Sequence, residues 1–213
     1  MDLYRVLNIR ELTDSTYVLR FERKNLIFIP GQHICVGMPG EENRPYSIYS
    51  GINDNYLEVL VKEVSRGNIS RKLKFLKPGE FVSVDQPEGA FTIENERNEK
   101  TPFWFISTGT GISPFHSFVR SYPDLNFHVI HGVRYEYETY DRQTYQNGIY
   151  FSCTSRDTKG NFNGRITDYL KNSELCISAY YYLCGSYEMI DQIFDLLVSR
   201  EIKMTQIKTE GYF

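Results

Sequence analysis

One glycine-rich segment of this chain has the residue types that bind phosphate groups. Residues 108–114 read ThrGlyThrGlyIleSerPro and follow a strand-like run. Glycines let the backbone approach a pyrophosphate closely, and a helix that starts there offers unpaired amides and a positive dipole. The pattern is GxGxxP rather than the usual dinucleotide fingerprint GxGxxG, so a tight strand–helix turn without a ligand is the alternative. We expect Gly109, Thr110 and Gly111 to contact a nucleotide.

A second pattern, ArgProTyrSer at residues 44–47, places a cation, an aromatic ring and a hydroxyl within four residues. In a strand, Arg44 and Tyr46 share one face, where a guanidinium can pair with a phosphate and a ring can lie flat on a heterocycle. Further along, GlyAsnIleSer at residues 67–70 combines a glycine turn with a helix start. The amides at such a start offer a site for a second phosphate.

Short runs of alternating polarity in the first hundred residues predict the strands that position the second pattern. They are separated by turn signals such as Pro30-Gly31 and Pro78-Gly79. Seven short strands at this spacing predict a closed antiparallel barrel, interrupted by a short helix at Ile69–Phe75. The runs are Tyr4–Ile9, Thr16–Phe21, His33–Val36, Tyr46–Ser50, Tyr56–Val64, Phe81–Val84 and Ala90–Ile93.

After Thr101 the pattern changes to strands followed by helices, which predicts a parallel sheet with helices on both faces. The polar, charged stretch 94–100 separates the two patterns. We therefore expect a first domain over residues 1–97 and a second over residues 98–213. The expected strands are Pro102–Ile106, Phe127–His131, Ile149–Cys153, Tyr180–Leu183 and a last one within Met204–Phe213. Helices are expected from Ser113, at Ile166–Leu170 and at Ser186–Ser199, with Ser186 as a cap.

Composition excludes several classes of protein. A length of 213 residues with 41% hydrophobic and 24% charged residues is ordinary for a globular chain. Apolar runs are far shorter than the roughly 20 residues of a membrane helix, and the amino terminus lacks the apolar run of a signal peptide. We expect a cytoplasmic protein without a membrane partner. A net charge of −3 argues against nucleic acid as the main partner.

Cysteines and histidines show no metal-ligand spacing, so we predict neither a zinc site nor an iron–sulfur cluster. The four histidines, at positions 33, 116, 128 and 131, are expected to have packing or surface roles. The four cysteines are at positions 35, 153, 176 and 184.

Several motifs of this chain occur in the order seen in ferredoxin–NADP reductases, and the sequence resembles that family from about Pro30 to its last residue. The ending resembles the bacterial branch, whose chains stop at an aromatic residue. The resemblance implies a two-domain fold: a six-stranded antiparallel FAD-binding β-barrel, then an NADP-binding α/β domain with a parallel sheet of five strands. The motifs are Arg44–Ser47, Gly67–Ser70, the GlyThrGlyIleSerPro turn, Ser155-Arg156, Gly164–Ile166, Cys184–Ser186 and Glu210–Phe213.

The resemblance also implies roles in FAD binding. Arg44 would bind the flavin phosphates, Tyr46 would pack on the isoalloxazine, and Ser47 would hydrogen-bond flavin N5. Thr108 would close the flavin side of the nucleotide pocket. Phe213 would contact the isoalloxazine or the adenine of FAD. Further residues implied to surround the ring and the diphosphate are Pro45, Val61, Lys62, Asn68, Ile69 and Ser70.

On the nicotinamide side, Ser155 and Arg156 resemble the pair that holds the 2′-phosphate of NADP, joined by Arg134 and Arg165. Several guanidiniums and a hydroxyl suit a dianionic phosphate, whereas an NAD site is expected to offer an acidic residue to the ribose. Asp157 follows the pair and keeps NAD open as the alternative.

Cys184 corresponds to a residue near nicotinamide C4. Together with Ser47 it would flank the hydride path, where both residues position the reactants rather than act as acid and base. A small buried hydrophobic role is the alternative for Cys184.

The resemblance implies hydride transfer between NADP(H) and FAD, and single-electron transfer between FAD and ferredoxin or flavodoxin, in a monomer or weak dimer. The alternatives are an NADH-dependent reductase of an oxygenase or cytochrome, and a non-catalytic flavin-binding subunit. Between Lys62 and Lys77, six basic residues stand against Glu63 alone, a local charge of +5. Such a segment beside the flavin would steer an acidic carrier, although a solvated helix face is the simpler interpretation.

Overall fold

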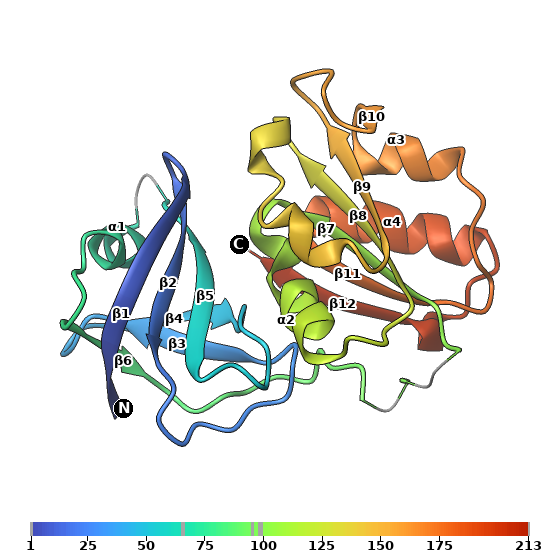
Figure 1. The fold of residues 1–213 in the computed structure, drawn as a ribbon. Helices are drawn as coiled ribbons and strands as arrows, with labels where there is room; N and C mark the ends of the chain where they lie inside the picture. The colour runs from blue at the N-terminus through green and yellow to red at the C-terminus, as the bar shows by residue number, and fades with distance from the viewer. Residues whose placement is uncertain (1, 65–66, 95, 98–99, 213) are drawn as a thin grey trace. The chain divides into compact units, whose positions relative to one another are not determined.

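The computed structural model describes residues 2–64, 67–94, 96–97 and 100–212, which form two compact units (Figure 1). One unit runs to Thr92 and also includes Ser113–Ser121; the other comprises Ile93–Ile112 and the chain from Tyr122 onward. A helix from the second half of the sequence therefore packs with the first unit. The domain division at residue 97 stays a prediction.

The first unit is built on the predicted six-stranded antiparallel sheet, with strand order β4-β3-β6-β1-β2-β5. A bridge between Ile48 and Val59 joins the two edges of this order and closes the barrel. Alternating residues such as Val6, Leu19 and Val59 fill its core. The strands are β1 (Asp2–Thr13), β2 (Thr16–Glu22), β3 (His33–Gly37), β4 (Arg44–Ser47), β5 (Tyr56–Lys62) and β6 (Phe81–Val84).

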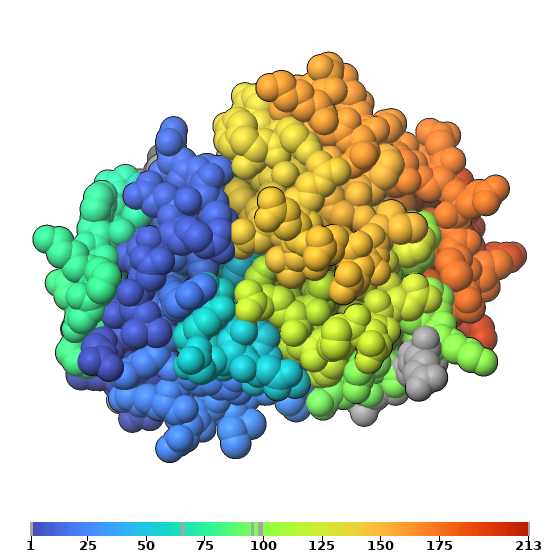
Figure 2. All heavy atoms as spheres, in the orientation of Figure 1, coloured from blue at the N-terminus to red at the C-terminus, as the bar shows by residue number. Residues whose placement is uncertain are grey.

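The short helix α1 (Asn68–Lys74) interrupts the strands, as predicted. Ile69 and Leu73, four residues apart, share one helix face and enter the barrel core. The opposite face is solvated, and Figure 2 shows this sea-green segment on the surface of its unit.

The predicted strand Ala90–Ile93 is wrong. Phe91 and Ile93 are buried, but residues 91–93 form no strand ladder. The ring of Phe91 lies instead against Phe115 and Phe118 of helix α2 (Ser113–Ser121). Burial against a helix produces the same alternation of apolar residues as burial in a sheet, which explains the error.

The second unit holds a parallel sheet with strand order β10-β9-β8-β7-β11-β12. The sheet has six strands rather than five, because Phe162–Asn163 adds a two-residue edge strand that is too short for an alternation pattern to reveal. The strands are β7 (Phe103–Thr108), β8 (Phe127–Val133), β9 (Ile149–Thr154), β10 (Phe162–Asn163), β11 (Tyr180–Ser186) and β12 (Ile207–Tyr212).

Helices α3 (Ile166–Lys171) and α4 (Tyr187–Ser199) pack apolar residues such as Leu170 and Ile193 on one face of this sheet. Ser186 caps α4, as predicted, because its side chain accepts a hydrogen bond from the Met189 amide. Short 3-10 helices complete the unit: η1 (Gly109–Ile112), η2 (Glu136–Glu138), η3 (Arg142–Tyr145) and η4 (Met204–Gln206). Within the described residues, no helix is both long and apolar enough to cross a membrane.

Candidate functional site

The ArgProTyrSer pattern forms β4. Arg44 and Tyr46 stand opposite Val36 and Ile34 of β3, so they share a strand face, as alternation predicts. The guanidinium of Arg44 is exposed and pairs with the exposed carboxylate of Glu42 at 2.9 Å, a contact weak enough for a phosphate to displace. Tyr46 is half-buried, and burial raises the pKa of its hydroxyl to about 12. The motif therefore presents an accessible cation and a neutral ring, as a flavin nucleotide requires.

Ser47 ends β4 and is only 4% exposed. The residues after it are held against β5 by the backbone: the Tyr49 amide donates to the Glu58 carbonyl at 2.7 Å, and the Glu58 amide donates to Ser50 Oγ at 3.1 Å. Glu58 is itself buried and pairs with Arg20 at 2.8 Å. The segment that follows the motif is thus rigidly placed.

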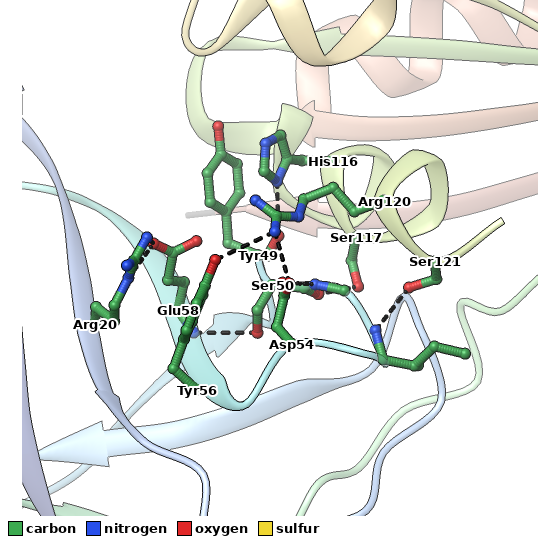
Figure 3. Close-up of polar contacts among 12 residues, drawn as sticks. Arg20, Tyr49, Ser50, Asp54, Tyr56, Glu58, His116, Ser117, Arg120 and Ser121 are labelled. Carbon is green, nitrogen blue, oxygen red and sulfur yellow. Dashed lines mark hydrogen bonds and ion pairs between the residues drawn. The ribbon is translucent and has the colours of Figure 1, made fainter. Parts of the chain in front are cut away.

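Helix α2 holds the same segment from the other side (Figure 3). The His116 ring stacks on Tyr49 with centroids 3.6 Å apart, and its Nδ1 lies 2.7 Å from the Tyr49 carbonyl oxygen. Ser117 Oγ donates to the Ser50 carbonyl at 2.7 Å. Both helix residues are buried.

One turn further along α2, Arg120 and Ser121 contact the loop before β5 (Figure 3). Arg120 pairs with Asp54 at 2.6 Å, and Ser121 Oγ accepts a hydrogen bond from the Ile52 amide at 3.0 Å. Positions 116, 117, 120 and 121 form one helix face. We call these four residues the α2 face. The sequence analysis missed this face, and its one local signal is polar residues at helical spacing.

At the start of α1, the predicted phosphate-binding residues differ in their surroundings. Asn68 is exposed, whereas Ile69 is part of the core and Ser70 is buried. Ser70 Oγ accepts a hydrogen bond from the Val64 amide at 3.2 Å, so this hydroxyl stabilises the turn itself. On the neighbouring strand, Val61 is buried in the core and Lys62 ends β5.

Three residues of the basic segment that includes α1 are paired with carboxylates. Lys72 binds Glu41 at 2.6 Å, and Arg71 and Lys74 lie 3.2 Å and 3.7 Å from Glu63. Lys74 also lies 4.0 Å from Glu11, and Arg66 lies outside the described residues. The local charge of +5 expected from the sequence is therefore reduced in space by acidic residues from other parts of the chain.

In the second unit, the glycine-rich segment forms η1 rather than the first turn of α2. Gly109 has a φ of +54°, in the left-handed region, with open space on its side-chain side. At Gly111 a Cβ would lie 2.4 Å from the Cys184 carbonyl oxygen, so this glycine allows the turn to pack on β11. Thr110 is half-buried, and Thr108 Oγ1 accepts a hydrogen bond from the Ser186 amide at 3.2 Å. Of the two glycines, Gly109 is the one with room for a ligand.

Cys184 lies in β11 beside Ser107 of β7 and is fully buried. Burial raises the pKa of its thiol well above the usual value, so the side chain is uncharged at neutral pH. An uncharged thiol suits the predicted positioning role better than acid–base chemistry. That role stays a prediction.

The ends of β8 and β9 bring three predicted phosphate-binding residues together. The Ser155 amide donates to the Val133 carbonyl at 3.0 Å, and the Arg156 amide donates to the Arg134 carbonyl at 2.8 Å. The guanidinium of Arg134 also binds Glu138 at 2.8 Å. Burial opposes ionisation of Glu138, but hydrogen bonds from the Arg134 side chain and backbone outweigh it and lower the pKa of this carboxyl.

The carboxylate of Asp157, the residue on which the NAD alternative rests, is hydrogen-bonded to the backbone. Its carboxylate accepts hydrogen bonds from the Glu136 amide at 2.8 Å and the Lys159 amide at 3.1 Å. These bonds, led by that from Glu136, lower the pKa of the carboxyl. One oxygen therefore joins the two loops and the other holds the Asp157 loop itself, so both are already engaged with the backbone.

Arg165 follows Gly164, whose amide donates to the Thr154 carbonyl at 2.8 Å, just before Ser155. It is the N-cap residue of α3, where its exposed guanidinium pairs with Glu188 of α4 at 3.4 Å. Phe213 lies outside the described residues, which end at Tyr212 of β12.

Comparison with known proteins assigns a nucleotide-binding domain to each half of the chain. The family model described as an oxidoreductase FAD-binding domain matches residues 4–93, and the model described as an oxidoreductase NAD-binding domain matches residues 105–194. The chain belongs to the oxidoreductases that join an FAD-binding domain to an NAD-binding domain, a family that includes ferredoxin–NADP reductases. It is thus an oxidoreductase with an FAD-binding and an NAD(P)-binding domain, which agrees with the predicted cofactors.

Individual relatives of this chain carry different names. It is 27% identical to the toluate 1,2-dioxygenase electron transfer component of Pseudomonas putida, over 97% of this chain and 66% of that protein. It is also 27% identical to the flavodoxin/ferredoxin–NADP reductase of Escherichia coli K12, over 87% of this chain and 85% of the relative. A crystal structure of a ferredoxin NADP⁺ reductase from Neisseria gonorrhoeae with bound FAD and NADP has the same fold, with a TM-score of 0.90. That alignment covers 100% of this chain and 98% of the other at 21% identity.

Proposed function

We propose that this reductase oxidises NADPH and delivers the electrons singly to ferredoxin or flavodoxin. The observation that carries the proposal is the pairing of the β8 and β9 ends, which presents Arg134, Ser155 and Arg156 together. Two guanidiniums and a hydroxyl suit a dianionic 2′-phosphate. The engaged carboxylate of Asp157 also favours NADPH over NADH.

The residues of β4 fit a bound flavin nucleotide. Arg44 offers an exposed guanidinium to the phosphates, and Tyr46 offers a half-buried ring to the isoalloxazine. When bound, FAD supplies the ability to accept a hydride and to release electrons one at a time. In this proposal Ser47 and Cys184 orient the reactants, and the buried Ser47 is kept in place by the segment that α2 holds.

A second candidate is an NADH-dependent reductase component of an oxygenase. It is favoured by the salt bridge between Arg134 and Glu138, because a guanidinium held at 2.8 Å by a buried carboxylate is less available to a phosphate. The relative from Pseudomonas putida, named as an electron transfer component, also supports it.

Rapid mixing of the holoprotein with each dinucleotide tests the proposal. The bound flavin is first released by heat and identified by mass, with FAD expected. Flavin bleaching is then followed anaerobically with NADPH and with NADH, and NADPH is expected to bleach it at least tenfold faster at equal concentration. Faster bleaching by NADH selects the oxygenase-type reductase, and no bleaching by either leaves a non-catalytic flavin subunit.

The acceptor is identified in a second step. Reduction of ferredoxin and of flavodoxin is compared with reduction of ferricyanide, which measures flavin turnover without a protein partner. Turnover with ferricyanide but with neither carrier would contradict the proposed acceptor. Size-exclusion chromatography tests the proposed monomer or weak dimer, and cell fractionation tests the proposed cytoplasmic location.

A further inference from the structure

A buried histidine attaches the glycine-rich turn to the centre of the parallel sheet. His131, near the carboxyl end of β8, is fully buried, and both of its ring nitrogens have partners. Nε2 lies 2.8 Å from the Gly109 carbonyl oxygen, and Nδ1 lies 2.8 Å from the Tyr150 hydroxyl. A carbonyl oxygen only accepts hydrogen bonds, so Nε2 carries a proton, and in the neutral ring the Tyr150 hydroxyl donates to Nδ1.

Burial keeps this ring neutral. It lowers the pKa of His131 to about 4, against the weaker opposing effects of the Gly109 hydrogen bond and the charge of Glu138. A neutral histidine has two tautomers, and only the one protonated at Nε2 can donate to Gly109. The Gly109 carbonyl, which only accepts, therefore fixes this tautomer, and the Tyr150 hydroxyl donates to the unprotonated Nδ1.

The Gly109 carbonyl matters because Gly109 is the glycine with room for a ligand. Gly109 has a φ of +54° and open space on its side-chain side. If its carbonyl oxygen were directed at a bound pyrophosphate, the oxygen would repel the phosphate groups. A hydrogen bond from His131 fixes that oxygen to β8. Fixing the carbonyl in this way favours an anion at the turn.

Tyr150 is in turn connected to the loops that present Ser155 and Arg156. The guanidinium of Arg142 lies over the Tyr150 ring, 5.3 Å from its centroid, and pairs with Glu136 at 2.7 Å. The Glu136 amide donates to the Asp157 carboxylate. One chain of contacts therefore runs from the candidate 2′-phosphate residues to the candidate pyrophosphate turn.

We propose that His131 is a positioning residue for the dinucleotide: its Nε2 proton holds the Gly109 turn in the conformation that binds the pyrophosphate, and the Tyr150 hydroxyl holds the ring in place by donating to Nδ1. This inference rests on the proposed function, because it assumes that the turn binds NADP(H).

A pair of amide substitutions separates the two hydrogen bonds. The side-chain nitrogen of His131→Gln reaches the place of Nε2 and retains the bond to Gly109, whereas the shorter His131→Asn reaches only the place of Nδ1. We expect the Kd of the holoprotein for NADP⁺ to rise about tenfold in H131N, as for one lost buried hydrogen bond, and to stay within about threefold of wild type in H131Q. The flavin difference spectrum reports the titration.

Adenosine 2′,5′-bisphosphate provides the internal control, because it lacks the pyrophosphate bridge. We expect its Kd to change less than about threefold in both variants. Equal Kd values for NADP⁺ in H131N and H131Q would overturn the inference, and so would equal losses for both ligands in H131N. A wild-type protein that does not bind NADP⁺ would instead overturn the proposed function, and this inference with it.

Two further measurements apply even if H131N does not fold. Nitrogen-15 NMR of the imidazole is expected to show a protonated Nε2 and an unprotonated Nδ1 in the wild type, and the opposite tautomer would overturn the inference. Tyr150→Phe is expected to weaken NADP⁺ binding severalfold. The control is Tyr169→Phe on α3, whose ring stacks on Phe151, and this variant is expected to bind NADP⁺ as the wild type does. Identical binding by the two variants would contradict the role of Tyr150.

Discussion

Among individual residues, the candidate 2′-phosphate cations differ in how accessible they are. Arg156 is exposed and is held through its backbone, whereas Arg134 is paired with the buried carboxylate of Glu138. Arg156 should therefore contribute more to phosphate binding than Arg134.

We predict that Arg156→Ala raises the KM for NADPH by about 10- to 100-fold, because a charge-assisted hydrogen bond contributes about 1.5–3 kcal/mol. The KM for NADH should change little, since NADH lacks the 2′-phosphate. Steady-state ferricyanide reduction measures both values, with Lys159→Ala as a matched exposed cation in the same loop. Equal effects of R156A on NADPH and NADH would contradict the assignment.

His131 should make stability depend on pH. The folded state binds a proton at this ring only near pH 4, whereas the unfolded state binds it near the ordinary value of 6.5. Between these values the unfolded state holds more protons, so stability falls as the pH falls from 6.5 to 4. The loss amounts to about 3 kcal/mol at pH 4.

His131→Gln removes this titration. Urea unfolding at several pH values between 7 and 4 should therefore show a shallower decline for H131Q than for wild type. Parallel declines would mean that His131 titrates similarly in both states.

The sequence placed Arg44, Tyr46 and Ser47 on one strand, as the structure does, because they are adjacent and form a motif; their roles at a flavin stay predictions. It also grouped Arg134 with Ser155 and Arg156, which the ends of β8 and β9 bring together. It missed His131, since a lone histidine has no partner at a recognisable spacing and its contacts with Gly109 and Tyr150 depend on the fold.

At the level of elements, α2 differs most from expectation. Strand–helix alternation predicted that it belongs with the parallel sheet, but its face of His116, Ser117, Arg120 and Ser121 packs with the first unit. The strands were predicted because alternation reflects burial within each strand. Partners of a helix face are distant in the sequence, so no local pattern identifies them.

We predict that Ser117→Ala lowers the free energy of unfolding by about 1–3 kcal/mol, because it leaves the buried Ser50 carbonyl without this donor. FAD retention should fall as well, since the segment that contains Ser50 follows the β4 motif. Urea unfolding and flavin loss on dilution measure the two effects.

The matched control is Ser199→Ala at the exposed end of α4, where Ser199 Oγ also donates to a backbone carbonyl, that of Leu196. It should cost less than about 0.5 kcal/mol. Equal costs at the two positions would show that the contact of Ser117 with Ser50 has no particular importance.

Across the whole molecule, the charge of a sequence segment differs from the charge around it in the folded protein. The basic segment from Lys62 to Lys77 is partly neutralised by Glu11 and Glu41, which come from other parts of the chain. Steering of an acidic carrier by this segment should therefore be weaker than the sequence suggests.

A pair of charge-neutralising variants tests this view. Glu41→Gln releases Lys72 from its 2.6 Å ion pair and should lower the KM for ferredoxin or flavodoxin at low salt by about two- to threefold. Lys72→Gln should raise it by a similar factor. Both differences should disappear above roughly 0.5 M salt, where exposed charges are screened. Equal KM values for the two variants at low salt would remove α1 from the docking surface.

The membership of α2 in the first unit also affects how the protein is made. The chain is made from its amino terminus at about 5–20 residues per second, so the barrel strands are synthesised before β7 and α2. Until then Phe91 lacks Phe115 and Phe118, and the carbonyls of Tyr49 and Ser50 lack His116 and Ser117. The nascent barrel is therefore incomplete until α2, which follows the first strand of the nucleotide-binding sheet, has been translated, so the first unit can finish folding only after part of the second has been made.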